Sequence, residues 1–161
     1  MKISIKSIVG IFFVWLLSSC SMHQPRVSQD ALLVALQKYD PSLKRDHFVS
    51  TSVDLNDDKC QDAIALMTPK SRYCGTRGCV MLTLLCKEGK LVPIGRTNYV
   101  SPIVSTSLRK TLGMKNIDVV IRPKGVPPHQ VSLQFNGQRY PLSALSARKI
   151  QKRRLERVLF K

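Results

Sequence analysis

Hydrophobic and polar positions divide the chain into two helical segments with a series of short strands between them. In the first segment, Leu32, Leu33 and Leu36 recur at helical spacing. Ser28, a typical N-cap residue, precedes them, and Pro41 cannot continue a helix. This pattern predicts an N-terminal helix of about eleven residues that ends just before the proline.

Short apolar and β-branched runs predict antiparallel strands in the middle of the chain. They cover residues 47–55, 63–67, 79–85, 91–99 and 117–122. Pro93 makes the fourth run an edge strand or a short one. Residues 100–115 are ambiguous between strand and irregular structure. In the stretch 131–142, Leu133 and Phe135 fall on one face, and the dipeptide Asn136-Gly137 predicts a two-residue hairpin.

The end of the chain, residues 143–160, is expected to form a second helix. Ser143 is suited to cap it, and several apolar positions share one side although others drift around it. The apolar positions on that side are Ala147, Ile150, Leu155 and Val158. Together the segments predict an α+β fold in which an antiparallel β-meander is flanked by an N-terminal and a C-terminal helix.

Residues 1–19 have the three-part layout of a secretory signal peptide. Lys2 and Lys6 make the start positive, residues 8–17 are apolar except for Gly10, and Ser18 and Ser19 are small. The apolar part is too short to span a bilayer comfortably, because a membrane helix needs about 20 apolar residues. We therefore expect export, with residues 1–19 removed.

The residues at the end of this signal, Leu17-Ser18-Ser19-Cys20, resemble the lipobox of bacterial lipoproteins. The resemblance implies lipidation of Cys20, a lipidated tether over residues 20–27, and stable membrane attachment through several acyl chains. Ser21, where enteric-type lipoproteins retained in the inner membrane carry Asp, implies the outer membrane. Residues 28–161 are then expected to form a single periplasmic domain. The alternative is a secreted protein in which this cysteine is coincidental.

Charge narrows the range of partners. The chain has 26 Lys and Arg against 10 Asp and Glu, and loss of Lys2 and Lys6 leaves 24 against 10, a formal charge of +14. This balance favours anionic partners such as lipopolysaccharide, anionic phospholipid, peptidoglycan or an acidic protein. Export makes nucleic acid an unexpected partner. The alternative is a basic but merely solvated surface.

Basic residues are densest in the predicted C-terminal helix, which makes this segment a candidate anion-binding patch. The residues are Arg148, Lys149, Lys152, Arg153, Arg154 and Arg157. Like charges crowded on a helix repel one another unless an anion or salt screens them. The alternative is a solvated helix face.

Four cysteines remain after Cys20 and predict disulfides, because an even number in an exported chain is typical of a disulfide framework. They are Cys60, Cys74, Cys79 and Cys86. If strands 63–67 and 79–85 pair antiparallel, the loop 74–79 is the tip of their hairpin. The predicted pairing is then nested, with Cys74 joined to Cys79 and Cys60 joined to Cys86. A zinc site is disfavoured because no C-x₂-C pair is present.

An acidic turn precedes the second strand. Oxygen-bearing side chains occupy positions 1, 3, 5 and 9 of a calcium-loop pattern, at Asp54, Asn56, Asp58 and Asp62. Lys59 stands where that pattern wants glycine, and no glutamate follows at position 12. The sequence therefore favours a turn whose side chains bond their own backbone, with bound calcium as the alternative.

The same motifs, taken together over residues 53–141, resemble those of small bacterial periplasmic proteins. Those proteins carry D-L-N-G-D-G, an apolar strand and C-G-T-G-G-C, where this chain has DLNDDK and CGTRGC. The shared motifs form a turn, a disulfide loop and hairpins. The resemblance thus implies a fold and no catalytic residue.

Catalytic motifs are missing from the sequence, which contains neither G-x-S-x-G nor H-E-x-x-H, and Glu88 and Glu156 are its only glutamates. We expect a non-enzymatic protein without a cofactor, acting by protein contact as an accessory of an envelope assembly such as a secretion or conjugation system. One alternative is a binding module for lipopolysaccharide or peptidoglycan. Another is an inhibitor or immunity protein whose loop 74–79 plugs the cleft of a wall-degrading enzyme.

Overall fold

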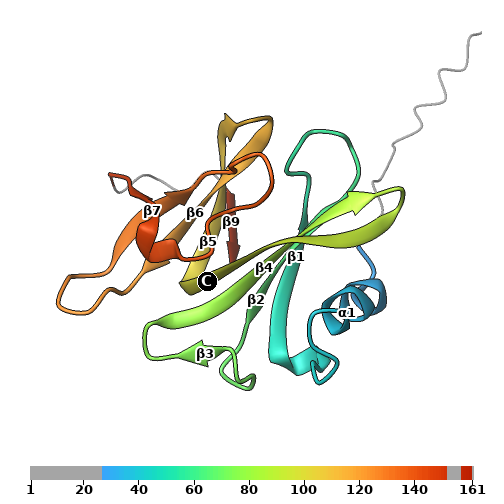
Figure 1. Ribbon diagram of the computed structural model, residues 1–161, viewed down its shortest axis with the longest axis horizontal. Helices are drawn as coiled ribbons and strands as arrows, with labels where there is room; N and C mark the ends of the chain where they lie inside the picture. The colour runs from blue at the N-terminus through green and yellow to red at the C-terminus, as the bar shows by residue number, and fades with distance from the viewer. Residues whose placement is uncertain (1–26, 152–156, 161) are drawn as a thin grey trace, which may run out of the picture.

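The computed structural model describes residues 27–151 and 157–160, which form a mostly antiparallel β-structure with one α-helix (Figure 1). This arrangement confirms the predicted α+β class. The elements are α1 (Gln29–Gln37), η1 (Arg45–His47), β1 (Phe48–Val53), β2 (Asp62–Met67), β3 (Cys74–Gly75), β4 (Gly78–Lys87), β5 (Lys90–Thr111), β6 (Met114–Ile121), β7 (His129–Leu133), η2 (Ala144–Ser146), β8 (Arg148–Lys149) and β9 (Arg157–Phe160).

The sheet has the order β1-β2-β4-β5-β6-β7-β8, while β3 pairs with β4 and β9 pairs with β5. Strand β5 turns the sheet. Its residues up to Val100 pair with β4, and those from Ser101 onward pair with β6 and β9. Register shifts interrupt both ladders, and Tyr99 and Ile103 have φ angles of 65° and 86°. Because bulges bend a strand, β5 contributes to two half-sheets (Figure 1).

The five predicted strands correspond to β1, β2, β4, the first part of β5, and β6. The ambiguous residues 100–115 contain the second part of β5 and its turn into β6.

Lys115 ties the two half-sheets together. Its amide donates to the Leu55 carbonyl at 2.7 Å, and its ammonium group lies 2.6 Å from the Asp57 carboxylate. Its own carbonyl accepts the Tyr140 hydroxyl at 2.6 Å. The turn between β1 and β2 is thus held against the β5–β6 hairpin, and the buried Tyr140 side chain fills the space beside it.

The predicted N-terminal helix is present as α1 and ends before Pro41, as expected. Ser28 is at its N-cap position, but its side chain makes no capping bond. The helix buries Leu32 and Leu36 in the core. Among the described residues, no helix combines the length and apolar character needed to span a membrane. The predicted signal peptide and Cys20 lie outside the described residues.

The predicted C-terminal helix over residues 143–160 is wrong. Ser143 caps only the short turn η2, and the chain then forms β8 against β7 and β9 against β5. Two causes favour this outcome. The apolar side chains of this segment do not form a continuous helical stripe, and like charges at helical spacing repel one another.

The hairpin predicted at Asn136-Gly137 is only partly present. The turn forms, because the Asn136 amide donates to the Arg139 carbonyl and its side chain accepts from the amides of residues 138 and 139. The described residues directly after this turn form no strand against β7, which pairs with β6 and β8. Tyr140 is drawn into the core, and Pro141 has no amide proton to donate to a ladder.

Candidate functional site

The two disulfides join the cysteines in the predicted nested order. Cys60 is bonded to Cys86, and Cys74 to Cys79. The Cα atoms of the first pair are 5.7 Å apart and those of the second 4.0 Å. The inner disulfide closes the β3–β4 loop, where its two cysteines also pair as strand neighbours. The outer disulfide fastens the β1–β2 turn to the end of β4.

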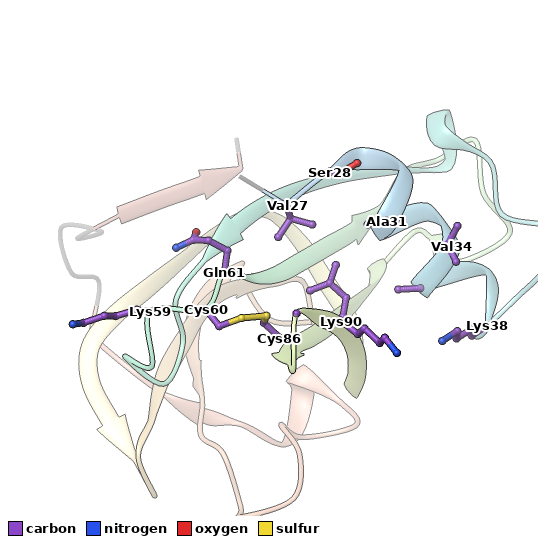
Figure 2. A pocket seen from close by; sticks show the side chains of 13 residues that line it. Val27, Ser28, Ala31, Val34, Lys38, Lys59, Cys60, Gln61, Cys86 and Lys90 are labelled. Carbon is purple, nitrogen blue, oxygen red and sulfur yellow. A yellow bond between two sulfur atoms is a disulfide. The ribbon is translucent and has the colours of Figure 1, made fainter. Parts of the chain in front are cut away.

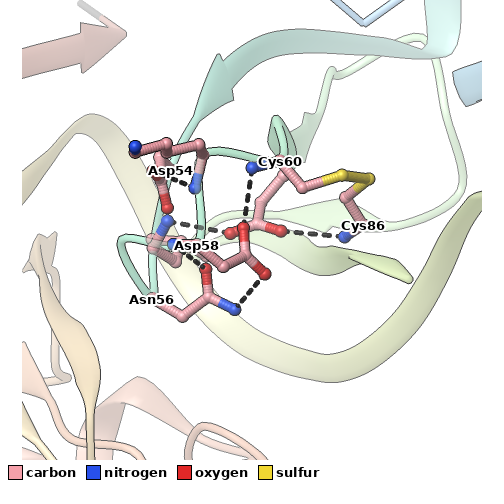
Figure 3. Close-up of a disulfide and its surroundings, with 8 residues drawn as sticks. Asp54, Asn56, Asp58, Cys60 and Cys86 are labelled. Atoms are coloured by element: carbon pink, nitrogen blue, oxygen red, sulfur yellow. Dashed lines mark hydrogen bonds between the residues drawn. A yellow bond between two sulfur atoms is a disulfide. The ribbon is translucent and has the colours of Figure 1, made fainter. Parts of the chain in front are cut away.

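The acidic turn uses its oxygens on its own backbone (Figure 3). The Asp54 carboxylate accepts the amides of Asp57 at 2.7 Å and Lys59 at 3.0 Å, and that of Asp58 accepts the amide of Cys60 at 2.7 Å. The Asn56 side chain accepts the Asp58 amide at 3.3 Å. In the described part of the chain, no three acidic, cysteine or histidine residues are grouped to hold a metal. The turn is therefore self-bonded, as the sequence favours, and bound calcium stays the alternative that the sequence left open.

Asp62, the last residue of that candidate calcium set, is fully buried, and its carboxylate bonds to backbone amides. Its carboxylate accepts the amide of Leu55 at 2.8 Å and the amide of Cys86 at 2.8 Å. Burial raises the pKa of Asp62 to about 6, although the two amide bonds act in the opposite direction. This side chain clamps the β1–β2 turn to β4 beside the outer disulfide.

The disulfide loop, residues 74–79, lies close against the bent part of β5. Gly78 has a φ angle of +126°, and a Cβ atom there would lie 2.7 Å from the Val100 carbonyl oxygen. Only glycine tolerates this backbone conformation and this approach. The positive φ of Tyr99 lies at the same contact. The loop is therefore fixed both by its disulfide and by its fit to β5.

One side of this loop faces a cleft of about 450 Å³, which we call the arginine–tyrosine cleft. Its wall contains three arginines and two tyrosines, Arg72, Tyr73, Arg77, Arg96 and Tyr99. The Arg77 guanidinium lies 4.6 Å from the Tyr99 ring centroid. The Arg96 guanidinium lies 5.9 Å from the centroid of the Tyr73 ring and 5.8 Å from that of the Tyr39 ring, which follows α1. Stacking on aromatic faces orients both guanidinium groups.

The charges of the cleft are only partly balanced. Arg72 forms a 2.8 Å ion pair with Asp40, whose pKa is well below its usual range because the Tyr73 hydroxyl and Ser42 donate hydrogen bonds to it. In the described ranges, no carboxylate lies within ion-pair distance of Arg77 or Arg96. The cleft therefore offers two oriented guanidinium groups to an anionic ligand.

The other side of the loop faces a second, more apolar cleft of about 500 Å³. Val49 of β1, Met67 of β2, Pro102 of β5 and Phe160 of β9 line it. The Ser101 hydroxyl also lines it and is buried without a hydrogen-bond partner among the described residues. The disulfide loop thus separates a cationic cleft from an apolar one.

The predicted basic patch is not assembled as a helix face. Arg148 and Lys149 are exposed in β8, and Arg157 begins β9. Lys152, Arg153 and Arg154 lie outside the described residues.

Both described histidines make local contacts. His47 contacts the Lys44 amide and the Asp46 carboxylate. His129 contacts the Pro127 carbonyl.

Sequence reasoning missed the arginine–tyrosine cleft, although its arginines and tyrosines lie close together in the sequence. Arg72 directly precedes Tyr73, and Arg96 and Tyr99 lie three residues apart. Their meeting depends on the bend of β5 and on Tyr39 approaching from α1, which no local pattern predicts.

Comparison with protein-family models, curated proteins and solved structures gives no match.

Proposed function

We propose that the protein is a non-enzymatic lipoprotein of the bacterial envelope that binds an acidic protein partner through the arginine–tyrosine cleft and the disulfide loop beside it. In this proposal it serves as an accessory of an envelope assembly such as a secretion or conjugation apparatus. The observation that carries the proposal is the pair Arg77 and Arg96, stacked on tyrosine rings and without a carboxylate within ion-pair distance among the described residues.

The composition of the cleft supports a protein partner. Arginine and tyrosine are, together with tryptophan, the residue types enriched at the energetic centres of protein interfaces. A guanidinium group held on an aromatic face is weakly hydrated and pairs with a carboxylate through two parallel hydrogen bonds. A rigid loop also loses little conformational entropy on binding, and the disulfide and Gly78 make this loop rigid.

The second cleft favours the same kind of partner. A protein can present acidic side chains to Arg77 and apolar side chains to Val49 and Phe160 across one loop. An anionic polymer is the second candidate. The formal charge of +14 supports it, but such a polymer lacks the apolar side chains that would fill the apolar cleft. In the inhibitor alternative, the loop itself enters the active site of a wall-degrading enzyme.

Cross-linking at Thr76 tests the proposal. This exposed loop residue lines both clefts. A photoreactive phenylalanine derivative in its place, in the lipidated full-length protein of living cells, is expected to capture one discrete protein. The same derivative at the exposed Lys124 is the control and should not capture it. A wall-degrading enzyme in the adduct would favour the inhibitor alternative. A heterogeneous polysaccharide ladder, or identical adducts at both positions, would contradict the proposal.

A further inference from the structure

A third concavity lies at the opposite end of β4 from the disulfide loop, and we call it the helix groove (Figure 2). It has a volume of about 640 Å³ and lies between α1, the outer disulfide and the β4–β5 turn. Its apolar wall includes Val27, Ala31, Val34 and Leu91. The volume is within the range of about 300–1,000 Å³ that small-molecule sites occupy.

The groove combines an exposed apolar surface with lysines at its edge. Val34 is 59% exposed on α1, although the opposite face of that helix is buried in the core. Lys38 follows α1, and Lys90 begins β5, and Figure 2 shows their side chains extending toward the same side of the groove. An apolar channel beside two ammonium groups complements an amphiphile that carries an acyl chain and a negative head group.

The position of the groove along the chain limits how far it lies from the proposed anchor. Val27, the first described residue, lines the groove and follows Cys20 by seven residues. Seven residues span at most about 25 Å even when fully extended. If Cys20 carries the lipid, the groove is therefore held close to the membrane surface, within reach of its head groups.

We propose that the helix groove binds an anionic phospholipid of the membrane to which the protein is anchored. One acyl chain lies along Val34 and Leu91, and the phosphate lies near Lys38 and Lys90. The inference rests on the proposed lipid anchor but uses none of the residues of the arginine–tyrosine cleft. It implies a fixed orientation, with α1 toward the lipid.

Tryptophan quenching tests this site in the lipidated full-length protein. Trp15 is the only tryptophan in the sequence and belongs to the predicted signal, so Val34→Trp introduces a single reporter into the mature chain. Val126→Trp is the matched control, because Val126 is 49% exposed in the β6–β7 loop. Each variant is reconstituted into vesicles of phosphatidylcholine that contain phosphatidylglycerol with brominated acyl chains.

The bromine atoms are expected to quench Val34→Trp several-fold more strongly than Val126→Trp. Adding Lys38→Glu and Lys90→Glu should reduce the difference strongly, since each lysine near an anionic leaflet strengthens attraction about fivefold. Equal quenching at the two positions, or quenching unchanged by the charge reversals, would overturn the inference.

Vesicle flotation of the same samples separates the two proposals. Failure to float contradicts the anchor and the inference with it, and flotation without Val34-specific quenching overturns the groove alone.

Discussion

Asp62→Ala is expected to lower the free energy of unfolding by roughly 4 kcal/mol, because it leaves one buried and one half-buried amide without an acceptor, each at a cost of about 1–3 kcal/mol. The two amides that lose their acceptor are those of Leu55 and Cys86, each 2.8 Å from the Asp62 carboxylate. Urea denaturation at pH 5 measures the loss, because Asp62 is mostly protonated there and the cost of burying its charge is small. Asp58→Ala in the same turn is the control, since its carboxylate is exposed and its removal should cost about 1 kcal/mol or less. Equal losses in the two variants would contradict the clamp.

The pH dependence of stability provides an independent signature of Asp62. Its pKa is about 6 in the folded protein and about 4 when exposed. Between these values the folded state binds a proton that the unfolded state does not, so stability should increase as the pH falls from 7 to 5. Asp62→Asn should remove this increase. Asp40 and Asp57 have lowered pKa values, so the stability they contribute is lost only below about pH 4, outside this window.

Removal of the outer disulfide by Cys60→Ser/Cys86→Ser is the second large effect that we expect. The bond closes a loop with a sequence separation of 26. Chain entropy then predicts a loss of about 3.5 kcal/mol. The result should not add simply to that of Asp62→Ala, because both contacts hold the β1–β2 turn against the same strand end.

The inner disulfide is the natural control for this measurement. Its sequence separation is only 5, so Cys74→Ser/Cys79→Ser should cost about 2 kcal/mol. Thermal and urea unfolding of both double variants, compared under oxidising conditions, give the order of the two losses. A loss from the outer pair no greater than that from the inner pair would show that loop closure is not what stabilises the turn.

The strands and the disulfide pairing were predictable because their signals are local. Ala63 and Leu84 are neighbours across the β2–β4 ladder, and the two apolar runs around a short loop favoured an antiparallel pair of these strands without fixing its register. Once the runs pair, the positions of the four cysteines follow. The self-bonded turn was predictable for the same reason, since Asp54 and Asp58 bond to backbone within five residues.

The C-terminal structure and the clefts were not predictable, because they depend on distant partners. Residues 148–149 and 157–160 become strands only because β7 and β5 offer them edges. The second part of β5 lacks a clear alternation because bulges interrupt it, with Ile103 at a φ angle of 86°. The position of Arg96 in the cleft depends on the rings of Tyr39, just after α1, and Tyr73, just before β3, which are distant from Arg96 in the sequence.

Charge reversal in the arginine–tyrosine cleft tests whether the acidic partner binds there. Arg77→Glu/Arg96→Glu is compared with Arg109→Glu/Lys124→Glu, which changes the net charge equally at exposed positions outside the clefts described above. The measured quantity is the yield of the Thr76 photo-cross-linked adduct. Breaking an interfacial charge pair costs about 2–5 kcal/mol, so the first variant should lose at least about tenfold in yield. The second should retain the wild-type yield. Equal yields from both variants would contradict binding through this cleft.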